Sequence, residues 1–238
     1  MFLMNDDQLV IFLHIQKTAG SSLITFIKKQ YTREKTWFGS EDKLQALSQN
    51  ETEGLSCIGG HFRYGIHEMF SKPSTYITML RDPVDRIVSY YYYLLNRPDH
   101  GKYQRAKDLD FETFLNTFQT KTSNFQTRRI TGGNPDLETA KKHLLENFSF
   151  VGLTERFEES LFLMKKEFDW TNTKYRNRNI TSQRPDQRHV PDEVISLIED
   201  NNKLDMELYR FAQDLFEKRI QSLDAKTKAE LENHLKSN

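Results

Sequence analysis

Short apolar runs bounded by polar residues recur along the chain and indicate buried β-strands. The run Leu9–Leu13 is rich in Val, Ile and Phe without a polar interruption, as expected of a central parallel strand that is buried on both faces. Residues 55–60, 75–80 and 148–153 form three further runs of this kind. Each run has the length of a strand and is too short for most helices.

Between these runs, apolar residues repeat at helical spacing. Residues 21–27 place their apolar side chains on one face of a helix that Ser21 or Ser22 can cap. A second helix begins at Pro83, with Asp82 as its cap. Residues 98–145 show helical pieces without a strand pattern and are expected to form a cap over the sheet. Two longer helices are expected at 157–168 and 204–220.

Alternating strands and helices predict an α/β domain with a central, mostly parallel sheet that is flanked by helices in three layers. In such a domain the ligand site lies at the carboxyl ends of the strands, which here are His14, Gly60 and Arg81. We expect residues 1–222 to form a single domain, with the helical cap and acceptor region at about 98–145. The charged residues 223–238 are expected to form a solvated tail.

The composition narrows the class of protein. The 238 residues are 37% hydrophobic and include 17 Phe and 10 Tyr, which is typical of a folded chain. Lys plus Arg and Asp plus Glu each total 34, so the charge balance predicts no nucleic-acid partner. The single cysteine, Cys57, and seven scattered histidines show no metal-binding spacing, and no apolar run is long enough to cross a membrane. We therefore expect a cytoplasmic protein without a metal, while its oligomeric state is not readable.

The segment His14-Ile-Gln-Lys-Thr-Ala-Gly-Ser-Ser leaves the first strand and enters a helix. The helix start offers free N–H groups to an anion, and Lys17, Thr18, Ser21 and Ser22 add side-chain donors. Gly20 permits a close backbone approach. The segment is not the GxxxxGK[ST] loop of nucleoside triphosphatases. It predicts either a phosphate site or a capped helix with a solvent-exposed lysine.

A second segment, Arg81-Asp-Pro-Val-Asp-Arg-Ile-Val-Ser-Tyr, follows the strand at 75–80. Arg81 at the strand end and Ser89 on the next helix could hold another anion, because a guanidinium binds phosphate through two parallel hydrogen bonds. In the alternative interpretation, Arg86 pairs with Asp82 or Asp85 and only braces the turn.

Taken together, HIQKTAGSS and RDPVDRIVSYYYYL resemble the two signature stretches of sulfotransferases that use 3′-phosphoadenosine 5′-phosphosulfate (PAPS). They look most like the branch of heparan sulfate and uronyl 2-O-sulfotransferases, and looser similarity extends over residues 8 to about 220. The resemblance implies a P-loop-like domain and a product nucleotide, PAP. It also implies that Arg81 and Ser89 bind the 3′-phosphate. The residues that the resemblance assigns to the 5′-phosphosulfate are Lys17, Thr18, Ala19, Gly20, Ser21 and Ser22.

A third segment, Gly59-Gly-His-Phe-Arg-Tyr, ends the strand at 55–60. Sulfuryl transfer to an alcohol needs a group that takes the hydroxyl proton, and a neutral imidazole suits this role near pH 7. His61 matches the histidine that acts as this base in the 2-O-sulfotransferases that the chain resembles. The resemblance also places a late loop over the nucleotide, here residues 177–185 with Thr181 and Arg184 as contacts.

These segments predict transfer of a sulfuryl group from PAPS to an acceptor hydroxyl, with His61 and Lys17 as catalytic residues and no metal. The acceptor is expected to be a saccharide, a glycolipid or another small alcohol, bound by Arg63, Tyr64, His67 and Arg128. One alternative is an ATP-dependent small-molecule kinase, but the chain shows neither a triphosphate loop nor a metal-binding acid. Another is an inactive glycan-binding scaffold, which we would expect to have lost His61 or Lys17.

Overall fold

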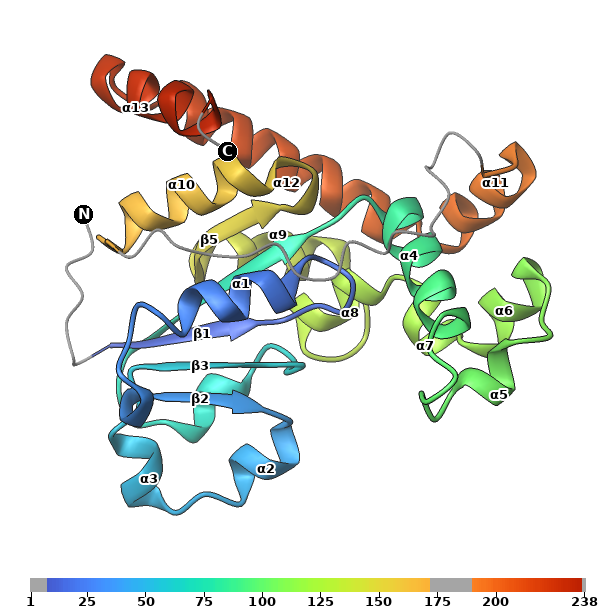
Figure 1. Cartoon of the computed structure of the whole chain (residues 1–238), viewed down its shortest axis with the longest axis horizontal. Helices are drawn as coiled ribbons and strands as arrows, with labels where there is room; N and C mark the ends of the chain where they lie inside the picture. The colour runs from blue at the N-terminus through green and yellow to red at the C-terminus, as the bar shows by residue number, and fades with distance from the viewer. Residues whose placement is uncertain (1–7, 172–189, 237–238) are drawn as a thin grey trace.

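The computed structural model describes residues 8–171 and 190–236. Within these ranges one parallel sheet has the strand order β2-β3-β1-β4-β5 (Figure 1). The strands are β1 (Leu9–Leu13), β2 (Thr36–Gly39), β3 (Cys57–Gly60), β4 (Ser74–Leu80) and β5 (Phe148–Leu153). The expected central parallel sheet is therefore confirmed.

Strand β1 lies in the middle of the sheet, and every one of its side chains is buried. Its last residue, Leu13, is level with Gly60 of β3 and Thr78 of β4. This register brings the carboxyl ends of three strands to one edge. Strand β2 was not expected from the sequence, because it has four half-exposed residues and adds only an outer strand to the sheet.

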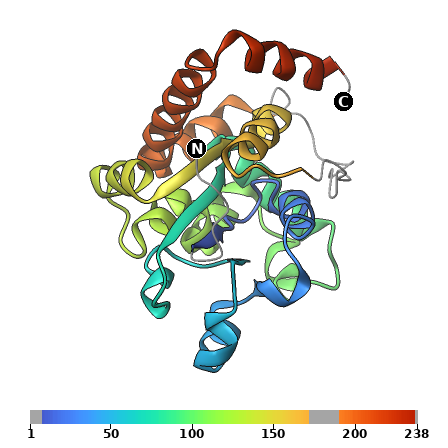
Figure 2. The ribbon, with the colours of Figure 1, turned by 90° about the vertical axis from the view of Figure 1, so that its left-hand side faces the viewer.

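Helices cover both faces of the sheet. α1 (Gly20–Ile27) and α10 (Phe157–Glu167) lie on one face, and α8 (Phe125–Thr131) and α9 (Leu137–Glu146) lie on the other (Figure 2). The long helix α12 (Lys203–Gln221) packs against β5, α8 and α9. The expected three-layer α/β arrangement is confirmed, including the strand–loop–helix unit at β1 and α1.

The region expected to cap the sheet divides into two parts. Only α8 and α9 lie against the sheet layer, whereas the preceding helices pack around α4 with a second apolar core. No strand occurs within residues 98–145, all of which the structure describes, as expected. The helices that contribute to this second core are α4 (Pro83–Leu95), α5 (Tyr103–Ala106), α6 (Phe111–Thr117) and α11 (Asp192–Asn201). The short helix α7 (Gln119–Thr122) follows α6 and contacts α8.

The expectation of a solvated C-terminal tail is wrong for residues 225–236. These residues form α13 (Ala225–Lys236), which packs on α10 and buries Leu231. An ion pair between Lys166 and Glu230 also joins the two helices. Because a charged amphipathic helix needs only a narrow apolar stripe to dock, its composition resembles that of a tail.

Five short helical turns complete the described chain. The α-helical turns α2 (Glu41–Gln45) and α3 (Gln49–Glu53) lie between β2 and β3. The 3-10 turns are η1 (Arg33–Lys35), η2 (Ile66–Met69) and η3 (Thr154–Arg156). In this part of the chain no helix has both the length and the apolar character needed to cross a membrane.

Candidate active site

The carboxyl ends of β1, β3 and β4 open into a cleft of about 940 Å³. The His14 amide donates to the Gly60 carbonyl at 2.9 Å, and the Thr78 hydroxyl donates to the Leu13 carbonyl at 2.9 Å. These bonds hold the three strand ends together. Most residues predicted from the sequence line this cleft: Lys17, Ala19, Gly20, Ser21, Ser22, His61, Arg81 and Ser89.

The loop from β1 to α1 makes its turn with two residues in the left-handed region, Lys17 (φ 73°) and Ala19 (φ 59°). Ala19 is the N-cap of α1, and no side chain caps this helix. The expected serine cap is therefore wrong. Thr18 is fully buried, and its hydroxyl donates to the Ile15 carbonyl at 2.8 Å instead of facing the cleft. The start of α1 therefore presents backbone N–H groups, with Ser21 and Ser22 beside them, as an anion site requires.

Gly20 is required by the close approach of a side chain. A Cβ atom at this position would lie 1.9 Å from Nε2 of His14 and 2.0 Å from its Cδ2. The imidazole of His14 thus rests directly against the first turn of α1. The ring also stacks on Phe12, with 5.4 Å between ring centroids.

We expect Gly20→Ala to lower stability by about 1–3 kcal/mol, because the added methyl group must displace the His14 ring from a packed position. The same change should weaken nucleotide binding at the start of α1. Thermal unfolding and calorimetric titration with PAP measure the two effects. Gly54→Ala is the matched control, since nothing lies within 4 Å of its Cβ position and its φ of -73° suits alanine. Equal effects of both changes would contradict the packing argument.

The orientation of His61 is set by one hydrogen bond. Its Nδ1 lies 3.0 Å from the carbonyl oxygen of His14. Because a carbonyl only accepts, Nδ1 carries the proton, and Nε2 of the neutral ring is left as the proton acceptor. The rings of His14 and His61 lie side by side, with 4.4 Å between their centroids.

Both imidazoles are held in the neutral form. Burial, together with the charges of His61 and Lys17, lowers the pKa of His14 to about 3. Partial burial also lowers the pKa of His61, and the cations Arg129 and Lys121 act in the same direction. The hydrogen bond to the His14 carbonyl opposes this shift. His61 is therefore available as a base at neutral pH.

Lys17 and Arg81 connect the two predicted anion-binding segments. The ammonium of Lys17 lies over the ring of Tyr93 on α4, 4.1 Å from its centroid. The Lys17 carbonyl accepts a hydrogen bond of 3.0 Å from Nη1 of Arg81. The loop before α1 and the strand end before α4 are therefore joined directly.

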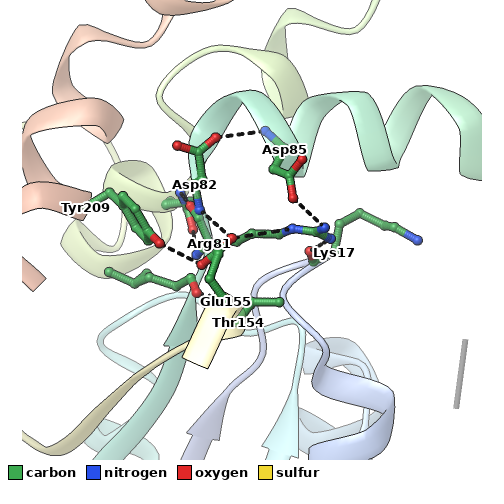
Figure 3. Close-up of polar contacts among 9 residues, drawn as sticks. Lys17, Arg81, Asp82, Asp85, Thr154, Glu155 and Tyr209 are labelled. Carbon is green, nitrogen blue, oxygen red and sulfur yellow. Dashed lines mark hydrogen bonds and ion pairs between the residues drawn. The ribbon is translucent and has the colours of Figure 1, made fainter. Parts of the chain in front are cut away.

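Arg81 is held at several points (Figure 3). Its Nη2 donates to Oδ2 of Asp85 at 2.9 Å, and its Nε faces Oε1 of Glu155 at 3.8 Å. The side chain of Gln126 pairs with the Arg81 backbone, accepting from its N–H at 3.0 Å and donating to its carbonyl at 2.7 Å. The strand end is thus fixed by residues from α4, α8 and η3.

The alternative interpretation, in which Arg86 pairs with Asp82 or Asp85 and braces the turn, is wrong. Arg81 pairs with Asp85, whereas Arg86 is fully buried and donates to the Lys121 carbonyl at 2.9 Å. Its guanidinium lies over the ring of Phe125, 5.1 Å from the centroid. Arg86 therefore connects α4 to α7 and α8, while Arg81 stays at the cleft.

The residues predicted to bind the acceptor are not brought to the cleft wall. The ring of Tyr64 stacks on that of His143, with 3.7 Å between ring centroids, and its hydroxyl donates to Asn147 at 2.9 Å. Nδ1 of His67 lies 2.8 Å from the hydroxyl of Tyr76. Both belong to an aromatic cluster beside β4 and β5, since the chain turns away from the strand ends after His61. Arg63 and Arg128 are also absent from the lining, and Thr181 and Arg184 lie outside the described residues.

The second half of α4 and the loop after it form another wall of the cleft. Tyr93, Asn96 and Arg97 line the cleft together with Ser89. These positions are four, seven and eight residues beyond Ser89, so they share its helical face. Sequence reasoning missed Asn96, which the periodicity of the segment could have identified once Ser89 was assigned. His100 and Lys102 from the following loop extend this wall.

Comparison with known proteins assigns the family. The model of the sulfotransferase family matches residues 1–212 of this chain. The chain belongs to the sulfotransferase family. The predicted PAPS-dependent sulfotransferase is thus confirmed at the level of the family, and nothing in the match supports a kinase. Among the described residues, no three His, Cys, Asp or Glu side chains come together as a metal site would require.

Two curated sulfotransferases with different specificities are similar to this sulfotransferase. Human (Homo sapiens) heparan-sulfate 6-O-sulfotransferase 1 is 26% identical over 285 aligned residues, covering 92% of this chain and 68% of the relative. Chicken (Gallus gallus) heparan sulfate 2-O-sulfotransferase 1 is 24% identical over 255 residues, covering 89% and 71%. Relatives of both kinds match, so placement in the 2-O branch stays a prediction.

A solved structure with a similar chain is mouse sulfotransferase SULT7A1 complexed with PAP. It is 14% identical, with a TM-score of 0.45, and the match covers 82% of this chain and 63% of that one.

Proposed function

We propose that this sulfotransferase moves the sulfuryl group of PAPS to a hydroxyl of an acidic saccharide, with His61 as the general base. The observation that carries the proposal is the hydrogen bond from Nδ1 of His61 to the His14 carbonyl. With Nδ1 bonded in this way, Nε2 is the basic nitrogen of a neutral imidazole that lines the same cleft as Lys17 and Arg81. A base and a group of anion-binding donors are what sulfuryl transfer to an alcohol requires.

The cleft residues fit the sulfuryl donor. Lys17 and the first-turn N–H groups of α1 would hold the 5′-phosphosulfate, and Arg81 with Ser89 would hold the 3′-phosphate. In support, Arg81 lines the cleft, and each of its Nη atoms keeps a second N–H beyond the bonds to the Lys17 carbonyl and to Asp85. The donor supplies an activated sulfuryl group whose leaving group is a phosphate oxygen.

Different residues act on the acceptor hydroxyl and on the leaving group. His61 takes the proton of the acceptor hydroxyl on Nε2 while the new O–S bond forms. As the bond between sulfur and the phosphate oxygen breaks, Lys17 and the α1 N–H groups stabilise the charge that develops on that oxygen. The proton on Nε2 then passes to water, which restores the neutral base.

Positive charge around His61 supports an acidic acceptor. Burial and the neighbouring cations Arg129, Lys102 and Arg63 lower the pKa of Lys121 to about 8. Lys102 also lines the cleft, beside Tyr90 and Tyr93. Cations beside aromatic rings are suited to sugars that carry carboxylates.

Calorimetric titration tests the donor site without knowledge of the acceptor. We expect PAP to bind markedly better than 5′-AMP, because only PAP carries the phosphate that Arg81 and Ser89 would hold. Tighter binding of ATP with magnesium, or no binding of PAP, would contradict the proposal. For the acceptor, transfer of labelled sulfate from PAPS to a uronate polysaccharide should exceed transfer to the same polymer with its carboxyl groups reduced.

A further inference from the structure

Two residues far apart in the sequence meet behind Arg81 (Figure 3). Glu155, in η3 after β5, accepts a hydrogen bond of 3.1 Å from the Asp82 amide through Oε1. Its other oxygen, Oε2, accepts a hydrogen bond of 2.6 Å from the hydroxyl of Tyr209 on α12. Oε1 is also the atom that faces Nε of Arg81 at 3.8 Å. The carboxylate therefore connects α12 to the strand end that carries Arg81.

Glu155 makes two hydrogen bonds in addition to facing Arg81. Burial raises the pKa of Glu155, and Tyr209, the Asp82 amide and Arg81 all favour its charged form. Burial and the nearby carboxylate raise the pKa of Tyr209, so its hydroxyl stays protonated and donates. The Glu155 side chain is 34% exposed, but both of its oxygens accept hydrogen bonds, and these bonds restrict the carboxylate to one orientation.

The same carboxylate restricts the orientation of Arg81. Its Nη1 and Nη2 donate to the Lys17 carbonyl and to Asp85, while Glu155 faces Nε from the opposite end. Each Nη atom carries a second N–H, and Arg81 lines the cleft. An arginine that is already oriented loses less rotamer entropy when it binds an anion than a mobile one does.

We propose that Glu155 and Tyr209 are positioning residues of the donor site, which hold Arg81 so that the enzyme selects nucleotides with a 3′-phosphate. The inference rests on the proposed function, because it takes Arg81 as the ligand of that phosphate. Neither residue touches the nucleotide. Their effect is confined to the discrimination between PAP and 5′-AMP.

The test removes the Tyr209 hydroxyl alone, with Tyr209→Phe. Calorimetry should show about a tenfold loss of PAP affinity, the size expected for one hydrogen bond to a charged group. Affinity for 5′-AMP should stay unchanged. In turnover assays KM for PAPS should rise while kcat at saturating PAPS is retained. Glu155→Gln keeps the shape of the side chain but loses its charge. It should also lower the ratio of PAP affinity to 5′-AMP affinity.

Tyr76→Phe is the matched control. Tyr76 is another buried tyrosine, and its hydroxyl is bonded to His67, outside the cleft. It should lower thermal stability without altering the ratio of PAP to 5′-AMP affinity. If Tyr209→Phe weakens both nucleotides equally, or neither, the inference is overturned while the proposed function stands. If the wild-type protein itself does not prefer PAP, the proposed function fails and the inference with it.

Discussion

Replacing His61 with alanine is expected to reduce kcat for sulfuryl transfer by about 10²- to 10⁴-fold, the usual contribution of a positioned general base. PAP affinity should be unchanged, because the proposed role of His61 is at the acceptor hydroxyl and not at the nucleotide. Steady-state turnover with PAPS and calorimetric titration with PAP measure the two quantities. Near-normal turnover in this variant would rule out the base assignment.

His143→Ala provides the control for His61. Its Nδ1 also lies 2.9 Å from a backbone carbonyl, that of Ile130, but the residue is outside the cleft. The pH dependence gives a second readout. Only the neutral imidazole accepts a proton, so the wild-type rate rises with pH through the pKa of His61. Because that pKa is lowered from 6.5, the rise should be centred below pH 6.5. In His61→Ala this limb should disappear.

Lys17→Ala should affect both turnover and binding. Removing a preorganised donor from the developing charge costs about 10²- to 10³-fold in kcat, and the lost ammonium should also weaken PAP binding. Lysine and alanine are equally disfavoured at the left-handed φ of position 17, so the substitution does not change the backbone strain there.

Lys28→Ala is the control for Lys17. Its ammonium also lies over an aromatic ring, that of Phe38 at 4.9 Å, but outside the cleft. Turnover and PAP affinity should both be normal in this variant. Weaker PAP binding with unchanged kcat in Lys17→Ala would restrict Lys17 to holding the nucleotide.

The parts of the fold that could be predicted are those whose signal is local. Strand β1 is a continuous apolar run, and the start of α4 carries its own cap, since Asp82 accepts from the Asp85 amide at 2.9 Å. Parallel strands bring their carboxyl ends to one edge. That rule alone placed His61, Lys17 and Arg81 in one cleft.

The parts that could not be predicted depend on contacts between distant residues. Tyr64 and His67 were expected at the acceptor because they follow His61 closely, but their partners Asn147 and Tyr76 draw them to another cluster. The composition of residues 225–236 predicts a tail, because the docking of α13 depends on its contact with α10 and not on its own composition. No local pattern connects Tyr209 to Arg81.

The set of contacts around Arg81 has a consequence for how the chain folds during synthesis. Gln126 fixes its backbone, Glu155 faces its guanidinium, and Tyr209 holds Glu155 from α12. When only the residues up to α11 have left the ribosome, all proposed donor-binding residues of the two anion-binding segments are present. Tyr209, which holds Glu155, is still missing. Such long-range contacts form late, and a nucleotide that binds only the completed site stabilises it. Nucleotide binding is thus linked to completion of the C-terminal half, and protection from proteolysis by PAP should first appear in nascent chains that include α12.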